Sequence, residues 1–222
     1  MNNQNSMLNA TKRIFIGLSF ISFPLIFVIA FAGHPNLLNP KFLGPAELIQ
    51  RAHNDSFLHF GHALVTLCTG LLVVVAIHFM NLLKNKSTEW LGFIGGVLAI
   101  FGALMLAADK GALCLTMSAL DTLPQSEFIK MMPGLLAIYG KEGWLILIWG
   151  LLFLPIGFTI QAIGILKSKR IKTWQGVLFL IGILFIGTPD GVEIINLTAA
   201  VLMTVAFFPY GLNLILNKEK VE

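Results

Sequence analysis

The sequence predicts an all-α integral membrane protein with six transmembrane helices. Two observations support this fold class. The chain of 222 residues is 56% hydrophobic and only 12% charged, whereas a typical soluble domain carries about 25% charged residues. It also contains six apolar stretches that approach the length of about 20 residues that a spanning helix needs. We therefore interpret residues 1–222 as a single polytopic membrane domain whose main partner is the lipid bilayer.

The six predicted spans cover most of the chain. The first, residues 14–32, follows Lys12 and Arg13 and in this respect is similar to a secretory signal. Its apolar run is longer than the about 7–15 residues of a signal's hydrophobic region, and we expect it to be retained as a helix. The other five spans are predicted at residues 57–83, 90–108, 144–166, 171–187 and 192–216.

Lysine and arginine are unevenly distributed between the two sets of helix ends. In one set they lie close to the apolar stretches, and in the other they are spread over two long loops, 33–56 and 109–143. Basic residues next to spans mark the cytoplasmic side of a membrane protein. We therefore predict a multi-pass protein of the cell membrane with both termini in the cytoplasm and these two loops outside. The basic residues near the spans are Lys12, Arg13, Lys84, Lys86, Lys167, Lys169, Arg170, Lys172, Lys218 and Lys220.

Both outer loops are expected to contain short helices. Three prolines prevent loop 33–56 from forming one continuous helix, but "PAELIQRAH" is compatible with a short interfacial helix that starts at Pro45. Loop 109–143 is unusually apolar. It is compatible with an outward extension of the third span, followed by a second interfacial helix from about Gln125.

A weak internal repeat connects two pairs of spans. "LLKNKSTEWLG" and "ILKSKRIKTWQG" both contain Leu-Lys-x-Lys, followed by Trp-x-Gly at the start of the next span. Spans two and three would then form a hairpin equivalent to spans four and five. Gene duplication and convergence on a sequence that suits a tight basic turn both explain this pattern.

Ionisable residues gather at the predicted outer mouth of the second span. Asp55, His59 and His62 are spaced by four and three residues, so they share one face of a helix. Asp109 closes the third predicted span on the same side, and Asp190 and Glu193 open the sixth. Because ionisable groups inside a membrane are costly, they are expected to face the interior of the bundle and to find partners there. These six residues form the predicted ligand or proton site, although Asp55 would also suit a helix cap.

The cluster has three chemical interpretations. Imidazole and carboxylate groups suit a divalent metal such as zinc or iron. For such a metal, His59 and His62 are the predicted ligands, with His34 and His53 as further candidates. The second interpretation is proton transfer, because histidine titrates near neutral pH. The third, a haem, is less favoured, since His62 and His78 are about 24 Å apart on one helix and His78 is expected to lie alone at the interface.

The sequence predicts a polar outward-facing pocket that binds a divalent metal or a small polar ligand. A small proton-coupled transporter or sensor is the first alternative, and a non-catalytic scaffold subunit with a structural polar rim is the second. The two cysteines provide no disulfide framework, and the basic residues sit in short runs that do not suggest nucleic acid. Phosphate-binding, dinucleotide-binding and hydrolase motifs are absent, so enzymatic activity, the cofactor and the oligomeric state stay open.

Overall fold

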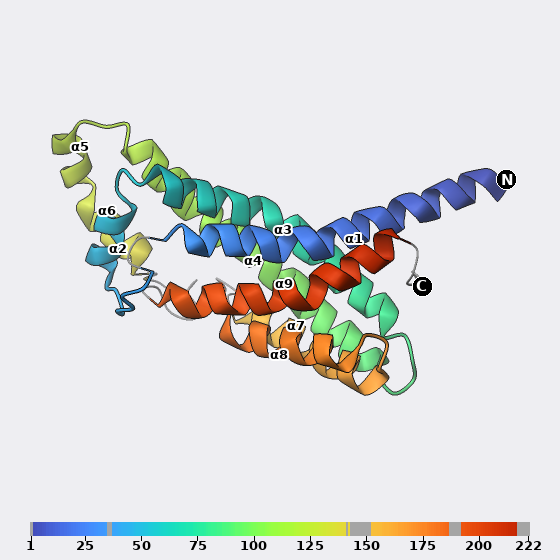
Figure 1. Ribbon diagram of the computed structural model, residues 1–222. Helices are drawn as coiled ribbons and strands as arrows, with labels where there is room; N and C mark the ends of the chain where they lie inside the picture. Colours follow the sequence, from blue (N-terminus) through green and yellow to red (C-terminus); the bar gives the residue numbers. More distant parts are fainter. Residues whose placement is uncertain (1, 35–36, 141, 143–151, 187–191, 217–222) are drawn as a thin grey trace.

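The computed structural model describes residues 2–34, 37–140, 142, 152–186 and 192–216, and all regular structure within these ranges is α-helical. Three short helices, α2 (Pro45–Ala52), α5 (Gln125–Lys130) and α6 (Met132–Tyr139), lie together at one end of the molecule (Figure 1). Its body consists of the long apolar helices α1 (Asn2–Ala32), α3 (Ser56–Leu82), α4 (Glu89–Leu120), α7 (Phe153–Ser168), α8 (Thr173–Phe185) and α9 (Glu193–Ile215).

The helices of the body pack in a closed ring. Helix α1 lies between α9 and α3, α3 packs on α4, α4 packs on α7, and α8 closes the ring between α7 and α9. Glycines allow two of these pairs to approach closely. A Cβ atom at Gly17 of α1 would lie 2.6 Å from the carbonyl oxygen of Gly211 in α9, and one at Gly157 of α7 would lie 2.2 Å from the backbone nitrogen of Ala99 in α4. Such small-residue contacts are typical of helix packing in membranes.

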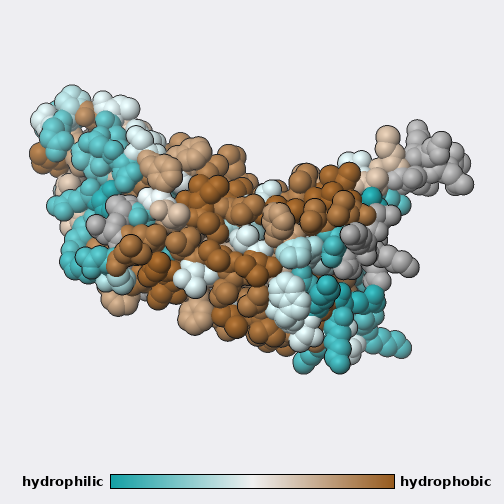
Figure 2. Space-filling view, viewed as in Figure 1, coloured by the Kyte–Doolittle hydropathy of each residue, from teal (hydrophilic) through white to brown (hydrophobic). Residues whose placement is uncertain are grey.

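Within the described ranges of the chain, four helices are long and apolar enough to cross a bilayer. They are Met7–Ala32, Ser56–Leu82, Glu89–Leu120 and Glu193–Ile215. Helices α7 and α8 are apolar but have only 16 and 13 described residues, or about 24 and 20 Å at 1.5 Å per residue. Figure 2 shows a hydrophobic band between two polar ends on the visible face. Large apolar side chains such as Leu67 (76% exposed) lie on the outside of the helices, as a lipid-facing surface requires.

The predicted spans agree with the helices in position and differ in length. The third predicted span ends at residue 108, and α4 continues through Asp109 to Leu120, which confirms the expected outward extension of this helix. The fourth predicted span, 144–166, overlaps α7, and its first residues lie outside the described part of the chain. The two short helices expected from Pro45 and from about Gln125 are α2 and α5. The six-span count and the cytoplasmic location of the termini stay predictions.

The buried residues form two separate cores. The larger core runs along the ring of long helices and is rich in phenylalanine, with Phe20, Phe79 and Phe207 in mutual contact. The smaller core contains Ile49 of α2, Met117 of α4, and Phe128 of α5. Helices α2, α5 and α6 therefore pack on one end of α3 and α4, in a core separate from that of the long helices.

His78 has a different environment from the one expected. It is only 3% exposed, and its Nε2 lies 2.8 Å from the hydroxyl oxygen of Tyr210 in α9. Its ring also contacts Phe20 of α1 edge-on. The expectation of a lone interfacial histidine is therefore wrong, because neighbouring helices cover His78 and supply a hydrogen-bonding partner.

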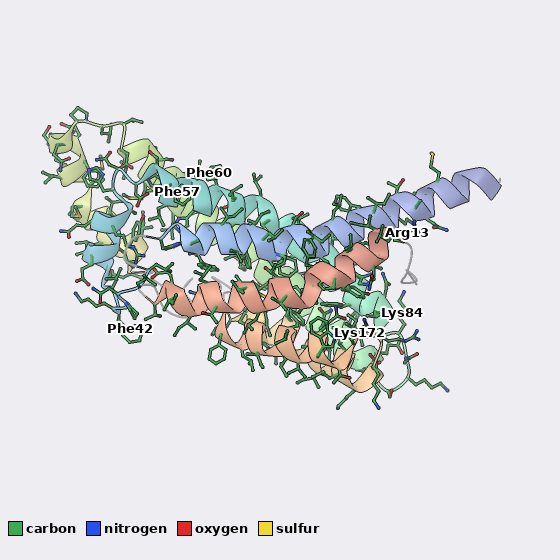
Figure 3. All side chains as sticks on the ribbon, in the orientation of Figure 1. Arg13, Phe42, Phe57, Phe60, Lys84 and Lys172 are labelled. Carbon is green, nitrogen blue, oxygen red and sulfur yellow. The ribbon has the colours of Figure 1, made fainter. Side chains whose placement is uncertain are left out.

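Basic residues next to the predicted spans lie at the end opposite to α2, α5 and α6. Arg13, Lys84 and Lys172 come from three distant parts of the chain, yet Figure 3 shows all three at this end of the bundle. The α3–α4 and α7–α8 turns and the C-terminal end of α9 lie at the same end (Figure 1). The two ends of the molecule thus differ in charge, as the distribution of lysine and arginine in the sequence suggested.

Candidate functional site

Local sequence signals position the polar residues near α2 and α3. Pro45 occupies the first turn of α2, and the backbone N–H of Gly44 donates a hydrogen bond to the Glu47 carboxylate (3.1 Å). Helix α3 starts after Asp55, whose carboxylate accepts a hydrogen bond from the backbone N–H of Leu58 (2.9 Å). Asp55 is therefore a helix cap, the structural role that its position in the sequence also permitted.

Two histidines and a backbone amide converge on Asp121, directly after the end of α4. The Nδ1–H group of His53 donates to one carboxylate oxygen (2.6 Å), and the Nε2–H group of His59 donates to the other (2.9 Å). The backbone N–H of Asn54 donates to the same oxygen as His59 (3.0 Å). The ring of His53 also stacks on Phe128 of α5, with centroids 4.0 Å apart. We call His53, His59 and Asp121 the Asp121 cluster.

The hydrogen bonds in the Asp121 cluster favour the ionised carboxylate. Partial burial alone would raise the pKa of Asp121, but the bonds from His59, His53 and the Asn54 amide outweigh burial and lower the pKa below its ordinary value of 3.8. Asn54 reaches Asp121 with a φ of 59°, in the left-handed region that asparagine tolerates better than most residues. The Asp121 cluster thus joins the start of α3 to the end of α4.

A second group of polar residues surrounds a cavity of about 40 Å³. This volume is about three times the about 10–15 Å³ that a cavity needs to hold one water molecule. Four apolar residues complete the lining. The polar lining residues are His34, Arg51, His62, Lys110, Tyr139 and Glu193, and we call this space the His34–His62 cavity.

Two pairs of side chains define the His34–His62 cavity. Arg51 of α2 and Glu193 of α9 form an ion pair with a distance of 2.9 Å between Nη1 and Oε1, and their side chains are only 10% and 5% exposed. The rings of His34 and His62 lie 6.0 Å apart. The pairing of Arg51 with Glu193 explains how a charged residue at the start of α9 is accommodated in a buried position.

The protonation of His34 is constrained on one side of its ring. Its Nδ1 lies 2.9 Å from the carbonyl oxygen of Ala30. Because a carbonyl only accepts hydrogen bonds, Nδ1 carries the proton, and Nε2 is left for other interactions. Burial lowers the pKa of His34 below 6.5, and this effect is larger than the opposing influence of the Glu193 carboxylate. The neutral ring is therefore favoured at neutral pH.

The residues predicted from the sequence separate into several environments. His34, His62 and Glu193 line the cavity, whereas His53 and His59 belong to the Asp121 cluster. Asp55 caps α3. The other two predicted residues are Asp109, which is buried inside α4 with its carboxylate 3.6 Å from the ammonium group of Lys110, and Asp190, which lies outside the described residues.

Sequence reasoning missed Asp121, Arg51 and Lys110. Asp121 was overlooked although an outward extension of the third helix was expected, because no end of that extension was predicted within "GALCLTMSALDTLPQ". A carboxylate just after the end of that extension was therefore not considered as a site residue. Arg51 carried a weaker signal, since only the tertiary contact between α2 and α9 places it beside Glu193.

Metal-ligating side chains are not grouped in the described ranges. Among residues 2–34, 37–140, 142, 152–186 and 192–216, no three histidine, cysteine, aspartate or glutamate side chains are arranged to hold a metal ion. The two histidines of the Asp121 cluster instead bind a carboxylate directly.

Comparison of the chain with protein-family models, with curated protein sequences and with solved structures finds no match.

Proposed function

We propose that this multi-pass membrane protein binds a small anion in an outward-facing site, the His34–His62 cavity, and that binding is coupled to protonation of a histidine. The observation that carries this proposal is the meeting of two imidazole rings with Arg51 and Lys110 around a small cavity of about 40 Å³. A site of this size suits a small inorganic anion such as chloride better than a large organic substrate.

The charges around the cavity support an anion over a metal cation. Arg51 is paired with Glu193, and Lys110 lies beside Asp109, so the formal charges of these four residues balance. A proton added to either imidazole introduces an uncompensated positive charge in a poorly solvated place. A small anion that enters the cavity would neutralise this charge, and this is the physical origin of the proposed coupling.

His34 is the residue that links the proton to the ligand. With its Nδ1–H group bonded to Ala30, the neutral ring offers only a lone pair at Nε2. Protonation turns Nε2 into a donor that can bind an anion. Burial lowers the pKa of His34, so the ring takes up a proton when an anion is present to compensate its charge. Anion affinity is therefore expected to rise as the pH falls.

A proton-coupled transporter or sensor is the second candidate. It is favoured by the 6.0 Å separation of the His34 and His62 rings, which brings two titratable groups together beside the paired charges of Arg51 and Glu193. The divalent-metal interpretation places zinc or iron at the same two rings and would use the lone pair of neutral His34. It would add two positive charges to a cavity whose formal charges already balance. A structural scaffold is the interpretation that remains if no ligand binds.

The proposal is tested by calorimetric titration of the purified full chain with sodium chloride against sodium gluconate at constant ionic strength. Chloride is expected to bind with one-to-one stoichiometry and more tightly at pH 5.5 than at pH 7.5. If one proton is taken up with each anion, the affinity for the anion rises by at most about tenfold for each unit by which the pH falls. His34→Gln is expected to remove the pH dependence, and His62→Gln to weaken binding.

Lys130→Gln is the matched control, because Lys130 lies in α5 at the same end of the molecule, in an exposed ion pair with Glu127 and outside the cavity. It should leave chloride binding unchanged. Zinc sulfate is the second probe. If chloride does not bind, but zinc binds one-to-one and His34→Gln abolishes zinc binding, the site is a metal site and the anion proposal is wrong. If neither probe binds at either pH, the small-ligand function is wrong.

A further inference from the structure

We propose that the α3–α4 and α7–α8 turns together form a binding surface for the headgroups of anionic phospholipids. The α3–α4 turn carries Lys84 and Lys86, and the α7–α8 turn carries Lys167, Lys169 and Lys172. All five side chains are exposed. We call these five residues the lysine surface. It lies at the other end of the bundle from the His34–His62 cavity, so the two proposals are independent.

The lysine surface has a strong excess of positive charge. Residues 83–90 and 166–174 contain the five lysines and Arg170 but only one acidic residue, Glu89. None of the ion pairs in the described part of the chain involves the five lysines. Positive side chains without a nearby carboxylate attract an anionic membrane surface, over a distance of about 10 Å at 0.1 M salt.

The two turns have the same construction, which explains why both present lysines in the same way. A Cβ atom at Gly92 of α4 would lie 2.8 Å from Leu83 at the end of α3. Likewise, a Cβ atom at Gly176 of α8 would lie 2.9 Å from the side chain of Leu166 at the end of α7. In each hairpin a glycine therefore lets the second helix pack closely on the leucine that precedes the Lys-x-Lys sequence.

Tryptophans place the lysine surface at the level of lipid headgroups. Trp90 and Trp174 stand two residues before the packing glycines, and their side chains are 72% and 45% exposed. Tryptophan is enriched where a membrane protein crosses from hydrocarbon to water. The apolar band of Figure 2 ends at this polar end of the molecule, where Figure 3 shows Lys84 and Lys172. An exposed tryptophan beside lysines at the border of the apolar band fits a phospholipid better than a soluble partner.

Native mass spectrometry of the full chain in mixed micelles of phosphatidylglycerol and phosphatidylcholine tests this surface. At equal lipid concentrations, the wild type is expected to retain more phosphatidylglycerol than phosphatidylcholine. The variant with Lys84, Lys86, Lys167, Lys169 and Lys172 all changed to glutamine should retain the two lipids equally. Lys84→Gln/Lys86→Gln alone should lose part of the preference, which keeps the test informative if the fivefold variant does not fold.

Lys41→Gln/Lys130→Gln is the matched control, since these two lysines are also well exposed (68% and 67%) but lie at the other end. Its lipid preference should equal that of the wild type. Equal retention of both lipids by the wild type would overturn the proposal, as would an unchanged preference in both lysine-surface variants. Displacement of phosphatidylglycerol by millimolar inorganic phosphate would also overturn it, because the surface would then bind a free phosphate group.

Discussion

Asp121 Oδ2 and His59 Nε2 lie 2.9 Å apart although 62 residues separate them in the chain. With His53, they connect the loop before α3, the first turns of α3 and the end of α4. The smaller core of Ile49, Met117 and Phe128 lies at this end of the bundle, and Phe128 stacks on His53. Polar and apolar contacts together thus hold the helices that carry the His34–His62 cavity.

Removal of the charge on Asp121 is expected to destabilise this end of the molecule. Asp121→Asn keeps the shape of the side chain but weakens three hydrogen bonds, and bonds to a charged group contribute about 1.5–3 kcal/mol each when well buried. Because the Asp121 cluster is partly exposed, we expect a total loss of about 1–3 kcal/mol in the free energy of unfolding. Denaturant unfolding in detergent measures this loss.

The comparison variant for Asp121→Asn is Glu127→Gln. Glu127 pairs with Lys130 on the surface, with side chains 45% and 67% exposed, and exposed ion pairs contribute about 0–1 kcal/mol. If both variants lose the same amount of stability, the Asp121 cluster has no special structural role.

The acid stability of the protein is expected to depend on Asp121. The pKa of this carboxyl is lower in the folded protein than its ordinary value of 3.8, so the unfolded chain binds its proton first as the pH falls. The stabilisation is fully present above about pH 4 and is lost as the pH falls through the folded-state pKa. The free energy of unfolding should therefore fall less steeply below pH 4 for Asp121→Asn than for the wild type. Parallel pH profiles for the two proteins would refute this.

Close packing between α4 and α7 is expected to tolerate no added methyl group at Gly157. A Cβ atom there would lie 2.2 Å from the backbone nitrogen of Ala99, so Gly157→Ala must separate the two helices. Overpacking of this kind costs about 1–3 kcal/mol. The matched control is Gly70→Ala in α3, where a Cβ atom meets nothing within 4 Å. Thermal unfolding in detergent should show a lower midpoint for the first variant only; equal midpoints would contradict this packing.

The hydrogen bond between His78 and Tyr210 is expected to make each single substitution more costly in stability than it is when the other partner is already replaced. Tyr210→Phe leaves the buried His78 without its 2.8 Å partner and should cost about 1–3 kcal/mol, whereas replacement of both polar groups removes the unsatisfied group. A double-mutant cycle with His78→Leu measures the coupling. Strictly additive losses would show that the bond contributes nothing.

Much of the fold was predictable because the bilayer imposes a simple requirement. A spanning helix needs an apolar run of a certain length, and such runs are visible in the sequence. The prediction was weakest where polar residues interrupt an apolar run, as Asp109 and Lys110 do in α4. The apolar span was predicted to end at these residues and its helix to extend outward; α4 does extend to Leu120, and Asp109 is buried within it, 3.6 Å from the ammonium group of Lys110.

Sequence alone determined the membrane class, the positions of the apolar helices and the end at which polar residues gather, since each follows from local composition and spacing. Tertiary structure decided which polar residues meet. His59 and His62 share a helix, yet one binds Asp121 and the other faces His34, because different helices approach α3 on the two sides. Partners such as Arg51 and Glu193 are 142 residues apart, and only the packing of α2 against the bundle brings their charges together.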